Sequence, residues 1–589
     1  MRFLFVTFFN PDNIGVRSLG ATLRAHGHDA HILQVKRLAS AACFPPPKEI
    51  GWYVYVQGIM KTDFLMPELS AKERQLVIQA IREYHPDVLG YSGMNTLDAQ
   101  FPDLAKLLRE AAPQAFFVAG GVGPTLKPEY YLRCGVDAVM RGESEESIVM
   151  LANTLRDGAD WHDVNNMCYL RDDTLVCNPL LPLPQKLEYP VPLLQEQDFS
   201  AIENDTYSPN KSICNLGDYI ITGSRGCIGH CSYCGAPRLR KLYDGICRSY
   251  IRNRDLDSIL QELKMAKQQG AYNIFFADDF FLRPADEMLT FFQRYKKEIG
   301  VPFSMYLHPQ QLIEYPEVLD AAIDAGLRSA PFGLQHGSEN FCRRVFRRKN
   351  FCHSYPVLVE RFLARGIPVI FHLIEGVPQE TEQDFDENLA FVAQFPTLPS
   401  RKPSVQFHVM FLNYIAGSAL LEDNPGIENL PRSTTDWAYR CLLLDLRQMT
   451  DDARFAAIRR EERYKTDILA LHALREQIDN ERHLEYIRQE AQRLKGREVY
   501  FWGGGWVYQQ HKHLFADCKP RAILIDKIFP RPETMDGIPV MTTEEVLPHN
   551  TENIPVVMFI RRKMIMRLLR NWQHAYTSTK DIVTCTEIL

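Results

Sequence analysis

Three cysteines on one short, glycine-flanked segment constrain this chain more than any other feature. Cys227, Cys231 and Cys234 are spaced C-x3-C-x2-C within residues 220–237. Three thiolates on one loop can bind three irons of a cubane cluster and leave the fourth iron without a protein ligand. A structural zinc site that uses the same cysteines and His230 is the alternative, although such sites usually take paired C-x2-C knuckles. We therefore expect a [4Fe-4S] cluster with one iron open to a substrate.

The loop resembles the signature of the radical S-adenosylmethionine (SAM) superfamily, C-x3-C-x-aromatic-C. Tyr233 fills the aromatic position. The resemblance implies that SAM chelates the open iron through its amino and carboxylate groups, and that one-electron reduction cleaves it to methionine and a 5'-deoxyadenosyl radical. It also implies an external one-electron reductant of the flavodoxin or ferredoxin type. The protein would hold and shield this cofactor chemistry.

The size and composition of the chain describe a soluble globular protein of several domains. Its 589 residues are too many for one hydrophobic core. The hydrophobic share of 46% and the charged share of 24% are ordinary for a soluble protein. The formal net charge of -6 gives no electrostatic reason to expect nucleic acid as the partner.

The N-terminal residues and the cysteine usage indicate where the protein works. Residues 1–10 carry one basic residue and an apolar run with no cleavage site behind it, which predicts a β-strand and not a signal peptide. No segment approaches 18 uninterrupted apolar residues, so no membrane span is expected. Fourteen cysteines, three of them in the loop above, favour a reducing cytoplasm over a disulfide framework.

Residues 1–155 show the alternation of an open parallel α/β sheet. Helical patterns separate short apolar runs at 2–7, 30–35, 88–92, 116–119 and 137–140. Ligands of such sheets bind at the carboxyl ends of the strands. The loops there are rich in glycine and polar residues, although each loop alone is typical of a turn.

As an ordered set ahead of the cysteine loop, these loops resemble the cobalamin-binding domain of one large branch of the superfamily. Gly120 and Gly121 would let the backbone approach the corrin or its nucleotide tail. The motif Asp-x-His-x-x-Gly, whose His replaces the lower cobalt ligand in other cobalamin enzymes, is absent. This leaves either a cobalt with no protein imidazole below it or a relic domain that binds nothing. The implied cobalamin contacts are Asn10, Ser18, Leu19, Ser92, Met94, Gly120, Gly121, Gly142 and Glu143.

A linker and a barrel are expected next. Residues 156–215 are predicted as a semi-extended linker, because the prolines within 177–192 cannot continue a helix or a sheet. Residues 216–430 are predicted to form a (β/α)6 partial TIM barrel, with its site at the carboxyl ends of the strands. The expected barrel strands are 219–222, 273–277, 303–307, 330–334, 369–374 and 405–411.

Polar residues follow the second and fourth of these strands. Residues 333–338 are similar to a Gly-[Ile/Leu]-[Glu/Gln]-Ser-Gly-Ser segment of the superfamily, which implies that Gln335 faces the ribose of SAM. His336 stands in place of a Ser, where it either donates a proton or packs behind the site. Asp278 and Asp279 either approach the SAM amino group or cap the following segment.

Two further segments extend the resemblance. Residues 376–381 resemble a Gly-x-Pro-Gly-Glu-Thr turn, with glutamine in place of the second glycine. This places the backbone of Gly376 beside the adenine, while Glu380 is expected to cap the next helix. Asn413, after the sixth strand, completes the implied SAM contacts. The basic run 343–349 is either a solvated helix face or an attractor for an anionic group.

The last part of the chain has two sections. Residues 431–496 are rich in helix formers and are predicted to be helical. Residues 497–589 are predicted to form a small Rossmann-like domain, because a strand precedes the glycines at 503–505 and a second strand ends at Asp526, about twenty residues on. Tyr508 occupies the place of the third glycine of the fingerprint. A dinucleotide site and an interaction or substrate-presenting module therefore both remain open.

Together these features predict an α/β multidomain protein, with an N-terminal Rossmann-like cobalamin-binding domain, the partial barrel, the helical segment and the small C-terminal Rossmann-like domain. The resemblance implies a cobalamin-dependent radical SAM methyltransferase, in which methylcobalamin methylates an unactivated carbon or a phosphinate of a small molecule or biosynthetic intermediate. The alternative is a non-methylating cyclase, oxidase or rearrangement enzyme, with cobalamin as an electron relay or absent. A zinc-stabilised scaffold without activity is the third hypothesis.

Overall fold

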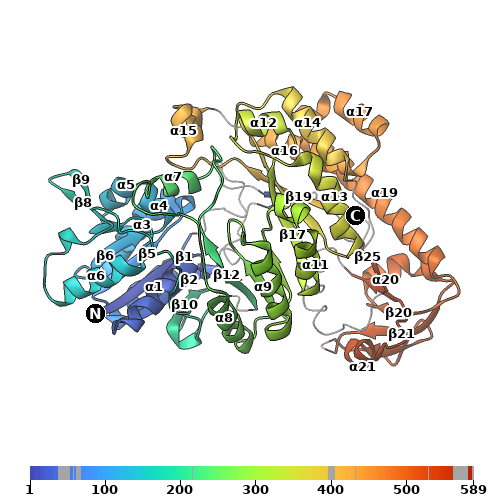
Figure 1. The fold of residues 1–589 in the computed structure, drawn as a ribbon. Coiled ribbons are helices and arrows are strands. Elements are labelled where there is room, and N and C mark those ends of the chain that lie inside the picture. The colour runs from blue at the N-terminus through green and yellow to red at the C-terminus, as the bar shows by residue number, and fades with distance from the viewer. Residues whose placement is uncertain are drawn as a thin grey trace. The chain divides into compact units, whose positions relative to one another are not determined.

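The computed structural model describes most of the chain as two compact units. One unit comprises Met1–Phe391 and Gln406–Trp437, and the other Val392–Val405 and Ala438–Leu589 (Figure 1). The expected domain starts at 216 and 431 lie outside the described residues. No described helix is both long and apolar enough to cross a membrane. The described residues are 1–37, 54–56, 59–61, 68–214, 217–395, 405–430, 433–527, 529–560 and 581–586.

The first sheet of the larger unit has nine strands in the order β11-β10-β2-β1-β5-β6-β7-β8-β9. The neighbours from β2 to β7 run parallel, as the sequence predicts. These strands are β1 (Arg2–Phe9), β2 (Asp29–Arg37), β5 (Val88–Ser92), β6 (Phe116–Gly120) and β7 (Ala138–Met140). The helices are α1 (Ile14–Ala25), α2 (Ala71–Tyr84), α3 (Phe101–Ala111), α4 (Val122–Leu126), α5 (Pro128–Arg133) and α6 (Glu145–Arg156).

Successive side chains of β1 pack into different cores. Phe3 and Phe5 belong to a cluster with residues of α1 and α6, whereas Leu4 and Val6 belong to a cluster with residues of α2 and α3. A strand with helices on both faces buries all its side chains, since consecutive residues point to opposite faces. This explains why the run at 2–7 is uninterrupted and apolar.

The segment 156–215 contributes strands as well as a linker. The hairpin of β8 (Met167–Arg171) and β9 (Thr174–Cys177) extends one edge of the first sheet, and β10 (Phe199–Glu203) with β11 (Thr206–Ser208) extends the other. Cys168 and Cys177 lie opposite each other in the β8–β9 hairpin and form a disulfide. The expected preference for free thiols is wrong for this pair, because the hairpin register brings the two side chains together.

The second sheet contains the six predicted barrel strands in chain order. The neighbouring strands from β12 to β18 are parallel. The strands are β12 (Asp218–Ile221), β15 (Asn273–Phe276), β16 (Phe303–Met305), β17 (Leu327–Gln335), β18 (Val369–Glu375) and β19 (Val405–Phe411). The helices are α7 (Ala236–Lys241), α8 (Leu256–Gln268), α9 (Ala285–Glu298), α10 (Pro309–Glu314), α11 (Pro316–Asp324), α12 (Glu339–Arg344), α13 (Tyr355–Ala364), α14 (Glu382–Ala393) and α15 (Ala419–Asp423).

A hairpin from the N-terminal part of the chain covers the last barrel strand. β3 (Val54–Val56) pairs antiparallel with β19, and β4 (Ile59–Lys61) pairs with β3. An uncovered edge strand exposes a row of unpaired N–H and C=O groups, so the hairpin protects β19. The sequence analysis did not predict this hairpin, since its partner strand lies more than 300 residues further along the chain.

The smaller unit contains the predicted helices and a Rossmann-like sheet. Its sheet has the order β22-β23-β21-β20-β24-β25, and all neighbours are parallel except β22 with β23. The strands are β20 (Glu498–Trp502), β21 (Lys519–Ile525), β22 (Thr534–Met535), β23 (Ile538–Thr542), β24 (Val556–Phe559) and β25 (Ile582–Cys585). The helices include most of α16 (Thr434–Met449), which begins in the larger unit, and then α17 (Asp452–Arg460), α18 (Arg463–Thr466), α19 (Ile468–Arg493), α20 (Trp506–His511) and α21 (Thr543–Val546).

Candidate active site

The three loop cysteines follow β12 and precede α7. Cys227, Cys231 and Cys234 are free thiols. A Cβ placed on Gly229 would lie 3.4 Å from the Cys227 Sγ and 3.5 Å from the Cys231 Sγ, so both sulfurs face the same glycine. The backbone N–H of Gly229 donates to the Cys227 Sγ (3.3 Å), and that of Ala236 donates to the Cys234 Sγ (3.4 Å). Such N–H···S bonds stabilise a cluster that three cysteines bind.

The cysteine thiols are held in a partly buried environment. Burial raises the pKa of Cys227, and it raises that of Cys234 to about 11. The negative charge of Asp279 adds to both increases. Iron must therefore displace protons from these thiols when it binds.

His230 does not complete a zinc site with the three cysteines. Its ring is exposed, and Nη2 of Arg240 donates to its Nδ1 at 2.7 Å. A Cys3His zinc site needs an imidazole nitrogen beside the three sulfurs. The geometry therefore favours the iron-sulfur prediction over the zinc alternative.

Arg348 is a neighbour of the cysteines that the sequence analysis missed. Its Nη1 lies 3.6 Å from the Cys231 Sγ, and its Nη2 donates to the Gly333 carbonyl oxygen. The basic run 343–349 is not one helix face, because α12 ends at Arg344. Arg348 thus brings a positive charge to the sulfur of a predicted cluster ligand.

Tyr233 and the two aspartates after β15 have different surroundings. The Tyr233 ring packs edge-on against Phe346, with ring centroids 4.7 Å apart. Both carboxylate oxygens of Asp278 accept the Gly223 N–H at 3.0 Å, and the Ser224 hydroxyl also donates to Asp278. Asp278 therefore fixes residues 223 and 224, between β12 and the cysteines, and these bonds do not go to the segment that follows it. Asp279 remains the aspartate whose charge acts on the cysteines.

Three side-chain amides, one at the end of β17 and the others after β18 and β19, indicate a polar ligand. Oε1 of Gln335, Oε1 of Gln379 and Nδ2 of Asn413 are buried and have no hydrogen-bond partner among the described residues. Buried polar groups are nearly always hydrogen-bonded, so each atom fits a contact with a bound cofactor. Gln335 also has φ of 70°, a left-handed conformation that is uncommon for residues other than glycine and is often found at ligand sites.

Gly376 directly follows β18 and lies against Phe411, the last residue of β19. Its φ is 78°, and a Cβ there would lie 2.6 Å from the Phe411 ring. Only glycine fits this turn without displacing Phe411. The amides and this glycine therefore fit the polar and planar parts of SAM, although their assignment to SAM stays a prediction.

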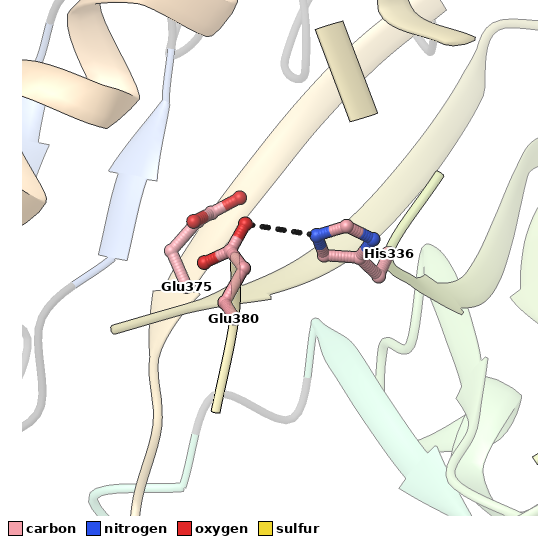
Figure 2. A group of neighbouring side chains, drawn as sticks. All are labelled: His336, Glu375 and Glu380. Carbon is pink, nitrogen blue, oxygen red and sulfur yellow. Dashed lines mark hydrogen bonds and ion pairs between the residues drawn. The ribbon is translucent and has the colours of Figure 1, made fainter. Parts of the chain in front are cut away.

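His336, Glu375 and Glu380 form a buried polar cluster that follows the ends of β17 and β18 (Figure 2). The Ser338 N–H donates to Nδ1 of His336, so the proton of a neutral imidazole is on Nε2, which donates to Glu380 at 3.0 Å. Both ring nitrogens are thus engaged, although the three side chains lie close enough for a metal ion. His336 joins the ends of β17 and β18, in agreement with the packing alternative.

The start of α14 differs from the expectation. Glu380 contacts His336, whereas Thr381 and Asp384 form the cap. The Thr381 Oγ1 accepts the Asp384 N–H at 3.2 Å, and the Asp384 carboxylate accepts the Thr381 N–H at 2.9 Å. The prediction that Glu380 caps this helix is wrong, because Thr381 stands one residue closer and forms a capping box.

A cavity of about 330 Å³ lies at the carboxyl ends of β5, β6 and β7. Asn10 and Met94 are not among its lining residues, and the Met94 side chain is 53% exposed. Thr222 and Arg225, which lead into the cysteine loop, also line it. The predicted cobalamin contacts that line the cavity are Ser18, Leu19, Ser92, Gly120, Gly121, Gly142 and Glu143.

Glycines shape this cavity. Gly121 has φ of 93°, and a Cβ there would lie 2.8 Å from the Gly93 carbonyl oxygen. Gly142 has φ of 77°, and its Cβ would collide with the Tyr243 hydroxyl. These residues therefore present backbone where other residues would present side chains. The cavity is lined mostly by apolar side chains and by the backbone of these glycines, and such a lining fits part of a corrinoid.

Ion pairs join the loop after β7 to the strand that leads to the cysteines. Arg225 contacts Glu143 at 2.7 Å and Glu145 at 2.5 Å, and Arg252 also pairs with Glu143. Burial alone would raise the pKa of Glu145, but the Arg225 charge and hydrogen bond lower it overall. These pairs could not be predicted from the sequence, since their members lie 80, 82 and 109 residues apart.

Comparisons with known proteins agree with this geometry. The model of the radical SAM superfamily matches residues 221–392, and the model of the B12 binding domain matches residues 48–152. The chain contains a radical SAM domain and a B12-binding domain. A radical SAM domain implies a [4Fe-4S] cluster and SAM as cofactors, and a B12-binding domain implies cobalamin.

Curated relatives of this chain are distant. An uncharacterized methyltransferase of Pyrococcus horikoshii is 22% identical over 54% of this chain and 66% of the relative. A putative methylthiotransferase of Methanocaldococcus jannaschii is 24% identical, over 50% and 61%. The anaerobic magnesium-protoporphyrin IX monomethyl ester cyclase of Synechocystis sp. is 26% identical, over 27% and 31%. The chain spans less than two thirds of the length of each.

A solved structure shares the fold of this chain. The radical SAM methyltransferase TsrM from Kitasatospora setae, with cobalamin and a [4Fe-4S] cluster bound, aligns with a TM-score of 0.52 and 16% identity. The alignment covers 69% of this chain and 75% of that chain. At this identity the comparison supports the arrangement of domains and not the choice of substrate.

Proposed function

We propose that this enzyme transfers a methyl group from SAM, by way of cobalamin, to an unactivated carbon or a phosphinate of a small molecule. The observation that carries the proposal is the shared wall of the first-domain cavity. Predicted cobalamin contacts such as Gly121 and Gly142 line it together with Thr222 and Arg225, and Arg225 stands two residues before Cys227. A methyl carrier and a radical source must both reach one substrate carbon, so their sites must be close.

The names of two similar proteins also support methyl transfer. The Pyrococcus relative is named a methyltransferase, and so is TsrM in its structure with cobalamin and the cluster. When bound, the cluster supplies the electron that cleaves SAM, and cobalamin carries the methyl group. An external flavodoxin-type or ferredoxin-type reductant is part of this proposal.

The protein's own residues have distinct tasks in the proposal. Gln335 and Asn413 satisfy their unpartnered amide atoms with SAM. Asp279, whose charge acts on Cys227 and Cys234, accepts from the SAM amino group. Arg348 holds a positive charge beside Cys231, where it offsets the negative charge of a thiolate-bound cluster. The backbone at Gly121 and Gly142 admits the corrinoid.

Product analysis tests the proposal. Protein purified and reconstituted under anaerobic conditions with cobalamin, SAM, a reductant and cell extract as substrate source should form S-adenosylhomocysteine and 5'-deoxyadenosine. Cys234→Ala should form no 5'-deoxyadenosine, whereas Cys134→Ala, outside the cluster loop, should behave as the parent. Formation of 5'-deoxyadenosine without S-adenosylhomocysteine would contradict methyl transfer.

A non-methylating reaction is the second candidate. The Synechocystis relative, named a cyclase, favours it. In that case, the same incubation yields 5'-deoxyadenosine and methionine in equal amounts, and no methyl group is transferred. If cobalamin relays electrons, leaving it out stops the reaction; if it takes no part, leaving it out changes nothing. Isotope-labelled SAM methyl groups distinguish the candidates, since only methyl transfer carries the label into product.

A further inference from the structure

A second cavity, of about 580 Å³, lies within the smaller unit and has no part in the reaction proposed above. It is at the carboxyl ends of β20, β21 and β24, where Trp502, Asp526 and Phe559 line it. Cavities of a few hundred Å³ with mostly apolar walls and a few polar groups are typical of small-molecule sites.

The order of the strands explains why a cavity forms here. Counted along the chain, the parallel strands β20, β21, β23, β24 and β25 lie in the order 3-2-1-4-5. The chain direction across the sheet reverses between β20 and β24, and ligands of open α/β sheets bind beside such a reversal. Gly503 lies at this point with φ of 98°, and a Cβ there would lie 2.6 Å from the Phe559 carbonyl oxygen. Only glycine fits, so the loop after β20 presents backbone to the cavity.

Asp526 provides a fixed acceptor in this cavity. It directly follows β21, and its Oδ1 accepts the Trp502 Nε1–H and the Thr543 hydroxyl, each at 3.0 Å. These two bonds orient the carboxylate and leave Oδ2 to accept from a ligand. In sheets of this order, an acidic residue at the end of the second strand binds ribose hydroxyls.

Two aromatic side chains line the same cavity and remain exposed. Trp506 is 57% exposed and Phe529 is 52% exposed. A flat heterocycle would cover such rings, and stacking of a base on an aromatic side chain contributes about 1 to 3 kcal/mol. Asp526 is the only ionisable side chain among the described lining residues, so these residues offer a phosphate group no cation.

We propose that this cavity binds the nucleoside part of a ligand, through stacking of its base and hydrogen bonds from a free ribose 2',3'-diol to Asp526. The departure from the dinucleotide fingerprint agrees with this ligand. Tyr508, in place of the third glycine, is buried, and its hydroxyl donates to Asp536 at 2.9 Å. The cavity therefore recognises the base and the ribose of the ligand, and it does not recognise a diphosphate.

Equilibrium dialysis of the full-length protein tests the proposal. Labelled adenosine and uridine are compared with 2'-deoxyadenosine and 2'-deoxyuridine on the parent and on Asp526→Asn. At least one ribonucleoside should occupy a site that Asp526→Asn lacks, since the uncharged amide accepts a hydrogen bond more weakly. The matching 2'-deoxynucleoside should bind that site about ten-fold more weakly or worse, because it lacks a hydrogen bond to a charged group.

Asp517→Asn is the matched control, because Asp517 is an exposed aspartate of the same unit that pairs with Lys495. It should bind as the parent does. Trp506→Ala should also lose ribonucleoside binding at this site. Because the Trp506 side chain is exposed, its removal leaves no cavity in the hydrophobic core. The proposal is overturned if neither ribonucleoside binds at millimolar concentration, if Asp526→Asn binds like the parent, or if ribose and deoxyribose forms bind equally. Because the readout is binding and not methyl transfer, failure of the reaction proposed above would not affect it.

Discussion

The side chain of Gln335 is placed to bind a ligand and not another protein group. Its Oε1 is buried without a partner in the described part of the chain, and its backbone is in the left-handed region. An unsatisfied buried polar atom costs about 1 to 3 kcal/mol, and left-handed backbone costs a similar amount. A bound ligand that donates to Oε1 recovers part of that cost, which is why we assign Gln335 to SAM binding.

Replacing Gln335 with Ala should weaken SAM binding by about 3- to 10-fold, the effect of losing one neutral hydrogen bond. Iron content should stay unchanged, because the cysteines do not depend on this side chain. Equilibrium dialysis with SAM measures the first quantity, and iron and sulfide analysis measures the second. Gln310→Ala is the control, since Gln310 is exposed and its side chain donates to Glu314 in the same helix, α10. Unchanged SAM affinity in Gln335→Ala would remove Gln335 from the site.

The sequence predicted residues whose role depends on local spacing and missed those whose role depends on distant partners. The cysteine triplet and Gln335 belong to short segments with recognisable order. Arg348 belongs to a run of five basic residues, and nothing local distinguishes the one that reaches Cys231. Glu380 was assigned to a helix cap because its spacing permits it, yet the buried His336 gives it a different partner.

At the scale of elements, the loop after β7 combines a backbone constraint with an electrostatic one. Gly142 is left-handed and lies against Tyr243, and Glu143 and Glu145 pair with Arg225. Glycine keeps the loop close to the cavity, and the ion pairs attach it to the strand before the cysteines. The two constraints can be tested separately.

Gly142→Ala should lose most of the bound cobalamin and keep its iron, because the new Cβ collides with the Tyr243 hydroxyl beside the cavity. Gly158→Ala is the matched control, since Gly158 also has a positive φ, 64°, but no atom of the described residues lies within 4 Å of its Cβ position. Both variants bear about 1 kcal/mol of left-handed backbone strain, so their difference isolates the collision. Corrinoid absorbance after reconstitution measures occupancy. Equal occupancy in the two variants would show that the loop does not bind the corrinoid.

Arg225→Gln should destabilise the larger unit by about 3 kcal/mol at pH 7.5, because it leaves the buried Glu145 carboxylate without its partner, whereas Glu143 keeps Arg252. In the parent, the folded-state pKa of Glu145 is lowered, so its stabilising contribution is present above the unfolded value and is lost as pH falls through the folded value. Without Arg225, burial raises that pKa instead, and protonation relieves the cost. The loss should therefore shrink at pH 5.5.

Urea unfolding of parent and variant at both pH values measures this difference. Arg74→Gln, which removes the exposed pair with Asp103, is the control and should cost at most about 1 kcal/mol with little pH dependence between the two conditions. A loss from Arg225→Gln that is equal at pH 7.5 and pH 5.5 would mean that water solvates Glu145 in the folded protein.

At the scale of the molecule, the alternation of apolar runs was enough to predict both parallel sheets of the larger unit and the Rossmann-like sheet of the smaller one. It was not enough to predict which short strands extend them. β3 and β4 are three residues each and join a sheet formed mostly by residues after 217. Strands of this length have no periodicity of their own, and only the exposed edge of β19 determines their place.

The division into two units leads to a prediction about ligand-induced protection. Every predicted cobalamin contact belongs to the larger unit, so cobalamin stabilises that unit directly. Hydroxocobalamin at about one hundred times its Kd should stabilise it by about 2.7 kcal/mol. Hydrogen–deuterium exchange should therefore slow in the loops after β5, β6 and β7, and exchange in β20 to β25 should stay unchanged. In Gly142→Ala, exchange in those loops should not slow.

Protection of the sheet of the smaller unit by hydroxocobalamin would contradict this prediction. Because a ligand stabilises the unit to which it binds, the cavity that Gly121 lines would then not be the cobalamin site.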